Sequence, residues 1–421
     1  MHASALLFVP WPLLGAVHLV LTAWNMRRFQ ASGASRPSPP EGNAPAARPV
    51  SPGEVPLPPE VSVVVPVRDE AGTLPACLAG LMAQDLTRVQ VLVVDDGSTD
   101  GSAEVSRQAA EEQAGVQVLT ASEPEAGWSG KAWACARGYE EAQGRWLVFL
   151  DGDVVLAPGA LEAALTEAKA ADMLIWAPRH PAGGHPLHTA LAPLTEALAL
   201  ASLPLDAVEG LPDARLAWPL GACLVIERGA YQRAGGHAAT SGTTAVALAL
   251  GRAVKASGGR VRVRDAGPWA AHAGPRGASP GADAAEGAPP PAAAGRPGPV
   301  LEDLRRTLYP ALGGAELPLL AGVALVLVLY VLPPLAAAVG WVAGWPGLAT
   351  AGLLQTVLAI AGRAWQVVRL GQAPWTAPLV PLAAAAWVGL ALASRGAWRQ
   401  GGVAWKGRAC PAPVAPQAGT R

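Results

Sequence analysis

The sequence predicts an α/β domain with a mainly parallel, Rossmann-like sheet and with transmembrane helices on both sides of it. Short valine-rich apolar segments alternate with helix-compatible segments from about Val61 to Asp265, as in parallel sheets that are covered on both faces. Two of these segments end abruptly in aspartates, at Asp95 and Asp151. The chain is 51% hydrophobic and only 15% charged, which is typical of a membrane protein with a globular part.

Residues 1–26 predict a transmembrane anchor. The segment from Ala3 to Trp24 is almost entirely apolar and long enough to cross a bilayer core of about 30 Å. A cleaved signal peptide is the alternative, but Arg27 and Arg28 follow the segment instead of preceding it. This charge distribution favours an uncleaved anchor with the next domain in the cytosol. Residues 27–60, rich in proline and alanine, are expected to be a linker.

Residues 61–265 form the predicted globular domain. Its strands are expected at Val61–Val67, Val89–Val94, Val116–Thr120, Trp146–Leu150, Met173–Ala177 and Cys223–Ile226. Its helices are expected over 74–81, Ala132–Gln143 and Gly159–Ala170. The sparsely charged segment Pro186–Leu205 predicts either a helix in the bilayer surface or a buried helix.

The C-terminal part predicts a second membrane region. Residues 266–300 are dominated by alanine, glycine and proline and are expected to be a disordered loop. Residues 301–409 contain apolar stretches for two or three spans, Leu317–Ala361 with a turn near 344–347 and Pro374–Ser394, and residues 410–421 form a tail. Arginines flank the last stretch on both sides, so the number of spans and the side of the C-terminus stay open.

Composition excludes some classes of function. The net charge of −1 gives no reason to expect a nucleic-acid partner. The four cysteines are scattered without metal-type spacing, and a reducing cytosol is expected for the globular part. Lysine is scarce, and its four positions are Lys131, Lys169, Lys255 and Lys406.

The sequence Asp151-Gly152-Asp153 follows a predicted buried strand and is a candidate metal site. Carboxylates hold Mg²⁺ or Mn²⁺ while the oxygens of a bound diphosphate complete the coordination shell. An acidic turn without a ligand is the alternative. A second acid cluster, Asp95-Asp96-Gly97-Ser98-Thr99-Asp100, follows another strand. There, Asp95 and Asp96 are candidates to bind a base or ribose, and the alternative is a helix cap by Asp96 or Ser98.

These motifs resemble family 2 glycosyltransferases of the GT-A fold. The resemblance rests on Val61-Ser-Val-Val-Val-Pro-Val-Arg-Asp-Glu70, on the two acid clusters, on Gly127-Trp-Ser-Gly-Lys131 and on Trp405-Lys-Gly-Arg408. The last two motifs are similar to the membrane-bound branch that includes carotenoid- and hopanoid-associated enzymes. The resemblance implies inverting transfer of a sugar from a nucleotide diphosphate sugar, expected to be a UDP-sugar, to a membrane lipid. It also implies a multi-pass protein of the cytoplasmic (inner) membrane with a cytosolic catalytic domain.

The resemblance also assigns roles to single residues. Pro66, Asp69 and Glu70 would line the nucleotide pocket, and Asp96, with Asp95, would contact uracil or ribose. Asp151 would contact the substrate, and Asp151 and Asp153 would hold Mg²⁺ or Mn²⁺. Lys131 would offset the charge of the diphosphate. The segment from Gly221 to His237 resembles the strand and helix on the acceptor side, where Tyr231 is interpreted as a core residue.

The sequence departs from the family where a catalytic base is expected. This branch has an aspartate after its Gly-Gly-His motif, whereas residues 238–255 contain no acid. His237 is the nearest proton acceptor and is the candidate catalytic residue. The Gln-x-x-Arg-Trp motif of processive synthases is also missing, which argues against polymer synthesis.

Three hypotheses follow. The first is transfer to a lipid hydroxyl, and the second is a catalytically weak homologue that binds nucleotide sugar or lipid. The third is transfer to a polyprenyl phosphate, an anionic acceptor that needs no base. Residues 405–408 are interpreted either as a basic clamp at the membrane interface or as a snorkelling flank of the last span.

Overall fold

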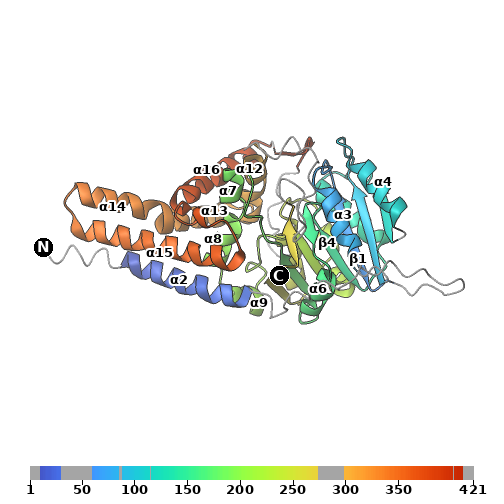
Figure 1. Cartoon of the computed structure of the whole chain (residues 1–421), viewed down its shortest axis with the longest axis horizontal. Helices are drawn as coiled ribbons and strands as arrows, with labels where there is room; N and C mark the ends of the chain where they lie inside the picture. The colour runs from blue at the N-terminus through green and yellow to red at the C-terminus, as the bar shows by residue number, and fades with distance from the viewer. Residues whose placement is uncertain are drawn as a thin grey trace, which may run out of the picture. The chain divides into compact units, whose positions relative to one another are not determined.

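The computed structural model describes residues 10–29, 59–84, 88–113, 115–273, 298–401 and 403–410. They divide into two compact units. The helical unit comprises the described parts of Met1–Phe29, Ala182–Ala207 and Gly295–Gly402. The sheet unit comprises those of Gln30–Pro181, Val208–Ala294 and Val403–Arg421. Figure 1 shows the helices of the first unit and the twisted sheet of the second.

A seven-stranded sheet forms the centre of the sheet unit, in the order β3-β2-β1-β4-β7-β6-β8. Strand β7 is antiparallel to both of its neighbours, and the other pairs are parallel. The predicted mainly parallel α/β sheet is therefore confirmed. The strands are β1 (Val61–Val67), β2 (Val89–Asp95), β3 (Val116–Thr120), β4 (Trp146–Leu150), β6 (Met173–Ala177), β7 (Cys223–Glu227) and β8 (Val261–Asp265).

Helices cover the sheet, and the strands form its core because they are apolar on both faces. Every residue of β1, β4 and β6 is buried. The helices of this unit are α3 (Leu74–Met82), α4 (Ser102–Glu112), α5 (Gly130–Glu141), α6 (Ala160–Ala168), α10 (Arg228–Arg233) and α11 (Val246–Ala256), with a 3₁₀ turn η2 (Gly236–Thr240). The short α9 (Leu205–Gly210) lies at the division between the units.

The sheet topology places three chemically rich segments at one edge. Parallel strands β1, β2 and β4 are adjacent, and Val67 pairs with Asp95 in the register of β1 and β2. The residues that follow these strands therefore emerge at the same, carboxyl edge of the sheet. Open α/β sheets bind their ligands at this edge.

Part of the loop predicted over 266–300 is structured, which corrects that prediction. Ala270–His272 forms β9, which pairs with β5 (Val154–Leu156) directly after the second acid cluster. The alanines that indicated low complexity here also suit a short strand, of which Ala270 is buried. The rest of the predicted loop, over 274–297, lies outside the described residues.

The helical unit consists of α2 (Pro10–Phe29), α7 (Pro186–Leu191), α8 (Leu194–Ser202), α12 (Gly298–Ala311), α13 (Glu316–Val326), α14 (Leu332–Val342), α15 (Pro346–Leu370) and α16 (Val380–Arg399). A π-helical turn, η3 (Leu327–Val331), joins α13 to α14, and a 3₁₀ turn, η4 (Pro374–Thr376), precedes α16. All residues of α8 except Ser202 are buried, so the buried-helix alternative for this part of 186–205 is correct.

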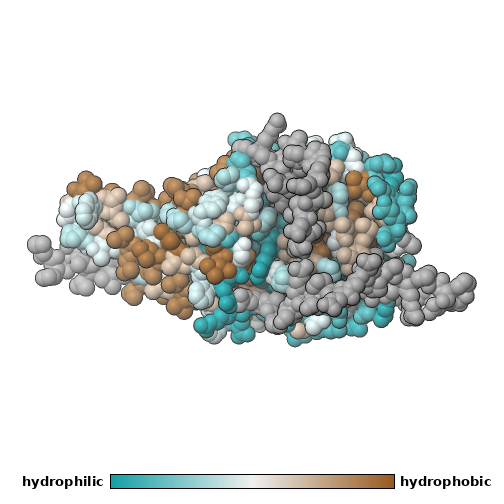
Figure 2. All heavy atoms as spheres, viewed as in Figure 1, coloured by the Kyte–Doolittle hydropathy of each residue, from teal (hydrophilic) through white to brown (hydrophobic). Residues whose placement is uncertain are grey.

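Three helices among the described residues are long and apolar enough to cross a membrane, at Glu316–Val342, Pro346–Leu370 and Val380–Arg399. Large apolar side chains are exposed on them, and Figure 2 shows brown surface on this unit. Helix α2 is not among the three. The anchor over residues 1–26 stays a prediction, and its first nine residues lie outside the described part.

Candidate functional site

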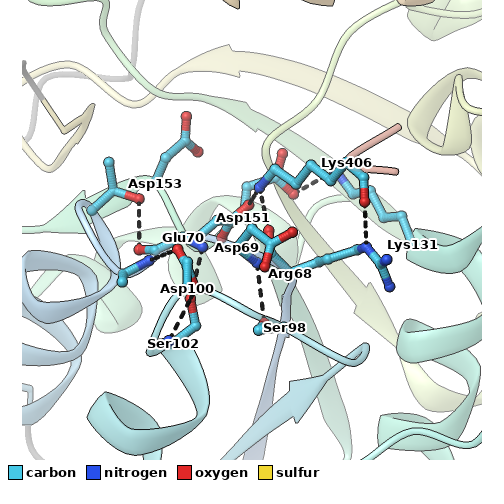
Figure 3. A network of polar contacts seen from close by, with 12 residues as sticks. Arg68, Asp69, Glu70, Ser98, Asp100, Ser102, Lys131, Asp151, Asp153 and Lys406 are labelled. Carbon is cyan, nitrogen blue, oxygen red and sulfur yellow. Dashed lines mark hydrogen bonds and ion pairs between the residues drawn. The ribbon is translucent and has the colours of Figure 1, made fainter. Parts of the chain in front are cut away.

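The loop that follows β1 is fastened to the loop that follows β2. The backbone N–H of Asp69 donates to Ser98 Oγ at 3.1 Å, and that of Glu70 donates to Ser102 Oγ at 2.7 Å. Asp69 has a φ of 48°, which is uncommon for a residue with a side chain. Its carboxylate accepts from the Thr99 N–H at 2.6 Å. These contacts hold the two loops at a fixed distance from each other, as Figure 3 shows for several of them.

Within the first acid cluster, some carboxylates hold the loops together, and another remains available to bind a ligand. Asp95 accepts from Ser98 N–H at 3.1 Å, and Asp100 accepts from Ser102 N–H at 3.0 Å at the start of α4. The N-cap of α4 is Gly101, which has no side-chain cap, so the alternative of a helix cap by Asp96 or Ser98 is wrong. The carboxylates of Asp69, Asp95 and Asp100 are all engaged in loop contacts.

Asp96 is the member of this cluster whose carboxylate can accept a further hydrogen bond. Its side chain is 2% exposed. Oδ1 accepts from Arg408, whereas Oδ2 is buried without a hydrogen-bond partner in the described structure. Burial raises the pKa of Asp96, although Arg408 and Arg68 oppose the shift. A buried carboxylate oxygen without a donor suits the imide N–H of a base or a ribose hydroxyl.

The second acid cluster follows β4, and each of its aspartates lies beside a basic side chain. Asp151 Oδ1 lies 2.5 Å from Lys131 Nζ, and Asp153 Oδ2 lies 3.2 Å from His272 Nδ1. Burial raises the pKa of Asp151 and outweighs Lys131. For Asp153, burial acts in the same direction, but His272 and nearby lysines outweigh it and the pKa is lowered.

Gly152 lies against the carboxylate of Glu70, between these aspartates. A Cβ at Gly152 would lie 2.0 Å from Glu70 Oε2. This oxygen is buried without a hydrogen-bond partner in the described part of the chain. Burial raises the pKa of Glu70 to about 7, helped by the charges of Asp153 and Asp151 and opposed by Lys406. Glu70 therefore belongs to the same group of carboxylates as the second cluster.

Lys131 enters the site from the first turn of α5. The preceding Ser129 donates its Oγ to the carbonyl of Thr243 at 2.9 Å, and its N–H to the carbonyl of Ser241 at 2.7 Å. The Gly127–Lys131 loop is thereby fixed against the segment that lacks the expected acid. Asp151 holds the Lys131 ammonium, and the side chain of Lys131 is 29% exposed.

His237 lies beneath Lys131 and the carboxylates of the second acid cluster, and not at the surface of the site. It is 1% exposed and lines a small cavity with Lys131, Asp151, Pro66 and others. Nδ1 lies 2.9 Å from the Tyr231 hydroxyl, and Nε2 is buried without a hydrogen-bond partner in the described structure. Tyr231 is itself buried against Phe149 and His237, as expected for a core residue.

We expect His237 to make folding sensitive to acid. Burial lowers the pKa of His237 to about 3, whereas an unfolded histidine has a pKa of about 6.5. Its contribution to stability is therefore complete above pH 6.5. It is lost as the pH falls toward 3, because only the unfolded chain binds the proton in this range. The free energy of unfolding then falls by at most about 1.4 kcal/mol per pH unit.

The measurement is the thermal midpoint of the detergent-solubilised protein at pH 7.5 and pH 5. His237→Asn should lose less stability between these two values than the wild type does. His185→Asn is the control, since His185 caps α7 through Nδ1 and asparagine is also a good cap. An equal acid-induced loss in His237→Asn and in the wild type would contradict the expectation.

Residues 403–410 make contacts that the sequence did not predict, and their interpretation as a basic clamp or a membrane flank stays a prediction. They belong to the sheet unit. Lys406 Nζ donates to Glu70 Oε1 at 2.9 Å, and Arg408 pairs with Asp96 and with Glu123. The basic residues of this segment therefore contact the carboxylates of the candidate site.

The sequence also missed His272, because it lies in the segment taken to be a loop of low complexity. The only sequence signal for a site residue in this segment was a single histidine near Trp269 and two alanines. Pairing of β9 with β5 places it opposite Val154, next to Asp153.

The residues at this edge fit a divalent metal. No group of three or more His, Cys, Asp or Glu among the described residues is arranged to hold one. Mg²⁺, however, is usually held by one or two carboxylates, with waters and substrate phosphates completing the shell. Asp151 and Asp153 supply such carboxylates, and the unpartnered Oε2 of Glu70 lies beside them.

Part of the sheet unit is similar in sequence to known proteins. Residues 62–201 match the family Glycosyl transferase family 2. The 4,4'-diaponeurosporenoate glycosyltransferase of Staphylococcus haemolyticus is 37% identical over 98 residues, which are 23% of this chain and 24% of that protein. The undecaprenyl-phosphate 4-deoxy-4-formamido-L-arabinose transferase of Aeromonas hydrophila is 37% identical over 103 residues, 23% of this chain and 30% of that protein.

Among solved structures, a mannosyltransferase from Pyrobaculum calidifontis in complex with GDP-Man and Mn²⁺ aligns with a TM-score of 0.46 and 18% identity. The alignment covers 93% of this chain and 98% of that one. The chain spans less than a third of the length of either sequence relative. The chain contains a glycosyltransferase family 2 domain, and the predicted resemblance is confirmed.

Proposed function

We propose that this protein transfers a sugar from a nucleotide diphosphate sugar to a membrane lipid, with inversion at the anomeric carbon. One observation carries the proposal. Two carboxylates, Glu70 and Asp96, keep buried oxygens that no hydrogen bond satisfies among the described residues. They lie at the carboxyl edge of the sheet in the region that matches family 2, beside the pair Asp151 and Asp153. Unpartnered buried carboxylate oxygens are costly in a folded protein, and a bound nucleotide and metal would satisfy them.

Each group of residues has a part in donor binding. Asp96 accepts from the base or ribose, and Lys131 leaves Asp151 to contact the diphosphate, where it offsets charge as the bond to the sugar breaks. Asp151 and Asp153 would hold Mg²⁺ or Mn²⁺, which would neutralise charge on the diphosphate leaving group. Pro66 lines the cavity beneath the donor. The acceptor oxygen attacks from the face of the sugar opposite to the diphosphate.

The acceptor is a lipid, because a glycosyltransferase domain is joined here to helices that can cross a membrane. We place the sheet unit on the cytosolic side of the cytoplasmic membrane, where nucleotide sugars are available. A lipid hydroxyl is the acceptor suggested by the resemblance to the carotenoid-associated branch and by the relative from Staphylococcus haemolyticus.

A polyprenyl phosphate is the second candidate acceptor, and a specific observation favours it. Residues 238–255 contain no acid, and His237 is almost completely buried, so neither offers an exposed base to an incoming hydroxyl. An anionic phosphate needs no base. The relative from Aeromonas hydrophila carries undecaprenyl phosphate in its name.

The test is a donor screen on membranes that contain the protein, with Mn²⁺ and with Mg²⁺. UDP-, GDP- and dTDP-sugars are offered with either a hydroxylated carotenoid or hopanoid mixture or with undecaprenyl phosphate, and the released nucleoside diphosphate is measured. Release with one acceptor class supports transfer and identifies that class. Nucleotide-sugar binding without release under any condition would instead support a binding protein that lacks transfer activity.

A further inference from the structure

The segment Val403–Cys410, called here the C-terminal hairpin, is built to present a lysine at its tip. Strands β10 (Ala404–Trp405) and β11 (Arg408–Ala409) pair antiparallel, and the two residues between them form the turn. Lys406 and Gly407 have φ values of 45° and 81°. Positive φ at both central residues is the signature of the type I′ turn, which asparagine and glycine adopt most easily. Lysine is unfavourable there, so its presence calls for an explanation beyond the turn itself.

Contacts in both directions fasten the tip of the hairpin to the loop after β1. Arg68 Nε donates to the carbonyl of Lys406 at 3.1 Å, and Lys406 Nζ donates to the carbonyl of Arg68. The ammonium also pairs with Glu70 Oε1 at 2.9 Å, and the side chain of Lys406 is 27% exposed. Glu70 Oε2 in turn occupies the space beside Gly152. The ammonium therefore lies next to the pair Asp151 and Asp153, where the diphosphate is expected.

The other cation of the hairpin lies at a different part of the site. Arg408 holds Oδ1 of Asp96 and leaves Oδ2 of that carboxylate without a hydrogen bond in the described structure, 3.8 Å from Arg68 Nη1. It also donates to Glu123 at 2.9 Å. The two cations thus divide the site, with Lys406 at the diphosphate end and Arg408 at the end that would bind the base and ribose.

We propose that Lys406 is a donor-binding residue that contacts the diphosphate, and that Arg408 is a positioning residue that orients Asp96 toward the base or ribose. The inference rests on the proposed function. When no donor is bound, Glu70 holds the ammonium; when the diphosphate binds, the flexible side chain of Lys406 moves to the phosphate oxygens. The hairpin then lies over the bound nucleotide.

The geometry of the turn provides a sharp test. Lys406→Asn removes the cation and creates the Asn-Gly pair that a type I′ turn favours, so the hairpin itself should be preserved. The ligand is whichever of UDP, GDP and dTDP the wild-type protein binds most tightly in the presence of Mg²⁺, together with its nucleoside monophosphate. Binding is measured by calorimetry on the full-length, detergent-solubilised protein.

Lys406→Asn is expected to raise the Kd for the diphosphate roughly 10- to 100-fold, as for the loss of a hydrogen bond to a charged group. The Kd for the monophosphate should change much less. Arg408→Gln should raise both Kd values by a similar factor, because it acts through Asp96. Lys169→Met is the control for loss of an exposed lysine, and it should change neither value.

Cys410, at the end of the hairpin, provides a second readout. It is partly exposed, whereas Cys77, Cys135 and Cys223 are buried. The diphosphate should slow alkylation of Cys410 by N-ethylmaleimide in the wild type, and this protection should be weaker in Lys406→Asn at the same ligand concentration.

The outcomes separate the two proposals. If the wild type binds a nucleoside diphosphate but Lys406→Asn binds it equally well, or if Lys406→Asn weakens monophosphate and diphosphate binding alike, the role of Lys406 is wrong and the proposed function stands. If the wild type binds none of the nucleoside diphosphates, the proposed function itself is wrong.

Discussion

Replacing Asp153 by asparagine should lower nucleoside diphosphate release from the donor by at least about 100-fold, the scale found when a key electrostatic group is removed from an active site. The substitution keeps the shape of the side chain but removes the charge expected to hold Mg²⁺ or Mn²⁺. Asp153→Asn should also abolish the dependence of nucleotide binding on Mn²⁺, measured by calorimetry with and without EDTA.

Asp213→Asn is the matched control. Asp213 lies in the same unit and also pairs with a cationic side chain, that of Arg215, but it lies outside the candidate site. It should keep wild-type release and metal dependence. Full release by the double variant Asp151→Asn/Asp153→Asn would show that the second acid cluster is an acidic turn without a ligand, which is the alternative that the sequence left open.

The second large effect is expected at Lys131. Lys131→Met should lower transfer by roughly 100-fold, because the ammonium near Asp151 would no longer offset charge on the departing diphosphate. The loss should appear mainly in kcat if the contact strengthens as the bond breaks. The measurement is steady-state nucleoside diphosphate release over a range of donor concentrations.

The scarcity of lysine provides two controls for this variant. Lys169 is exposed, and Lys169→Met should behave like the wild type. Lys255 is 4% exposed and donates to the carbonyls of Val208 at 2.7 Å and Leu216 at 2.6 Å. Lys255→Met should therefore lower the thermal midpoint. If Lys131→Met lost stability in the same way but kept its kcat, Lys131 would be a structural residue.

Much of the fold could be predicted because its signals are local. Continuous apolar runs such as Val61–Val67 and Trp146–Leu150 are buried strands in the structure, as their composition indicated. Asp95 and Asp151 could be placed at one edge because parallel strands end there together. The sequence did not separate the roles within the first cluster, since the bonds of Asp95 and Asp100 to the backbone depend on turn geometry.

The positions of His272 and of the C-terminal hairpin could not be predicted from the sequence. His272 lies 119 residues from Asp153 along the chain, in a segment whose alanines indicated no structure. Lys406 lies 336 residues from Glu70. Its position beside arginines after an apolar helix is also typical of a membrane flank, and no local pattern distinguishes the two.

By itself, the sequence determined the strands, the acids at their ends and the apolar helices, because burial and chain direction follow from residue type over a few positions. The tertiary structure alone decided which basic side chains contact those acids. Arg408 pairs with Asp96, and His272 with Asp153. Such pairs form between distant parts of the chain, so they depend on strand pairing and loop closure over hundreds of residues and leave no periodic trace in the sequence.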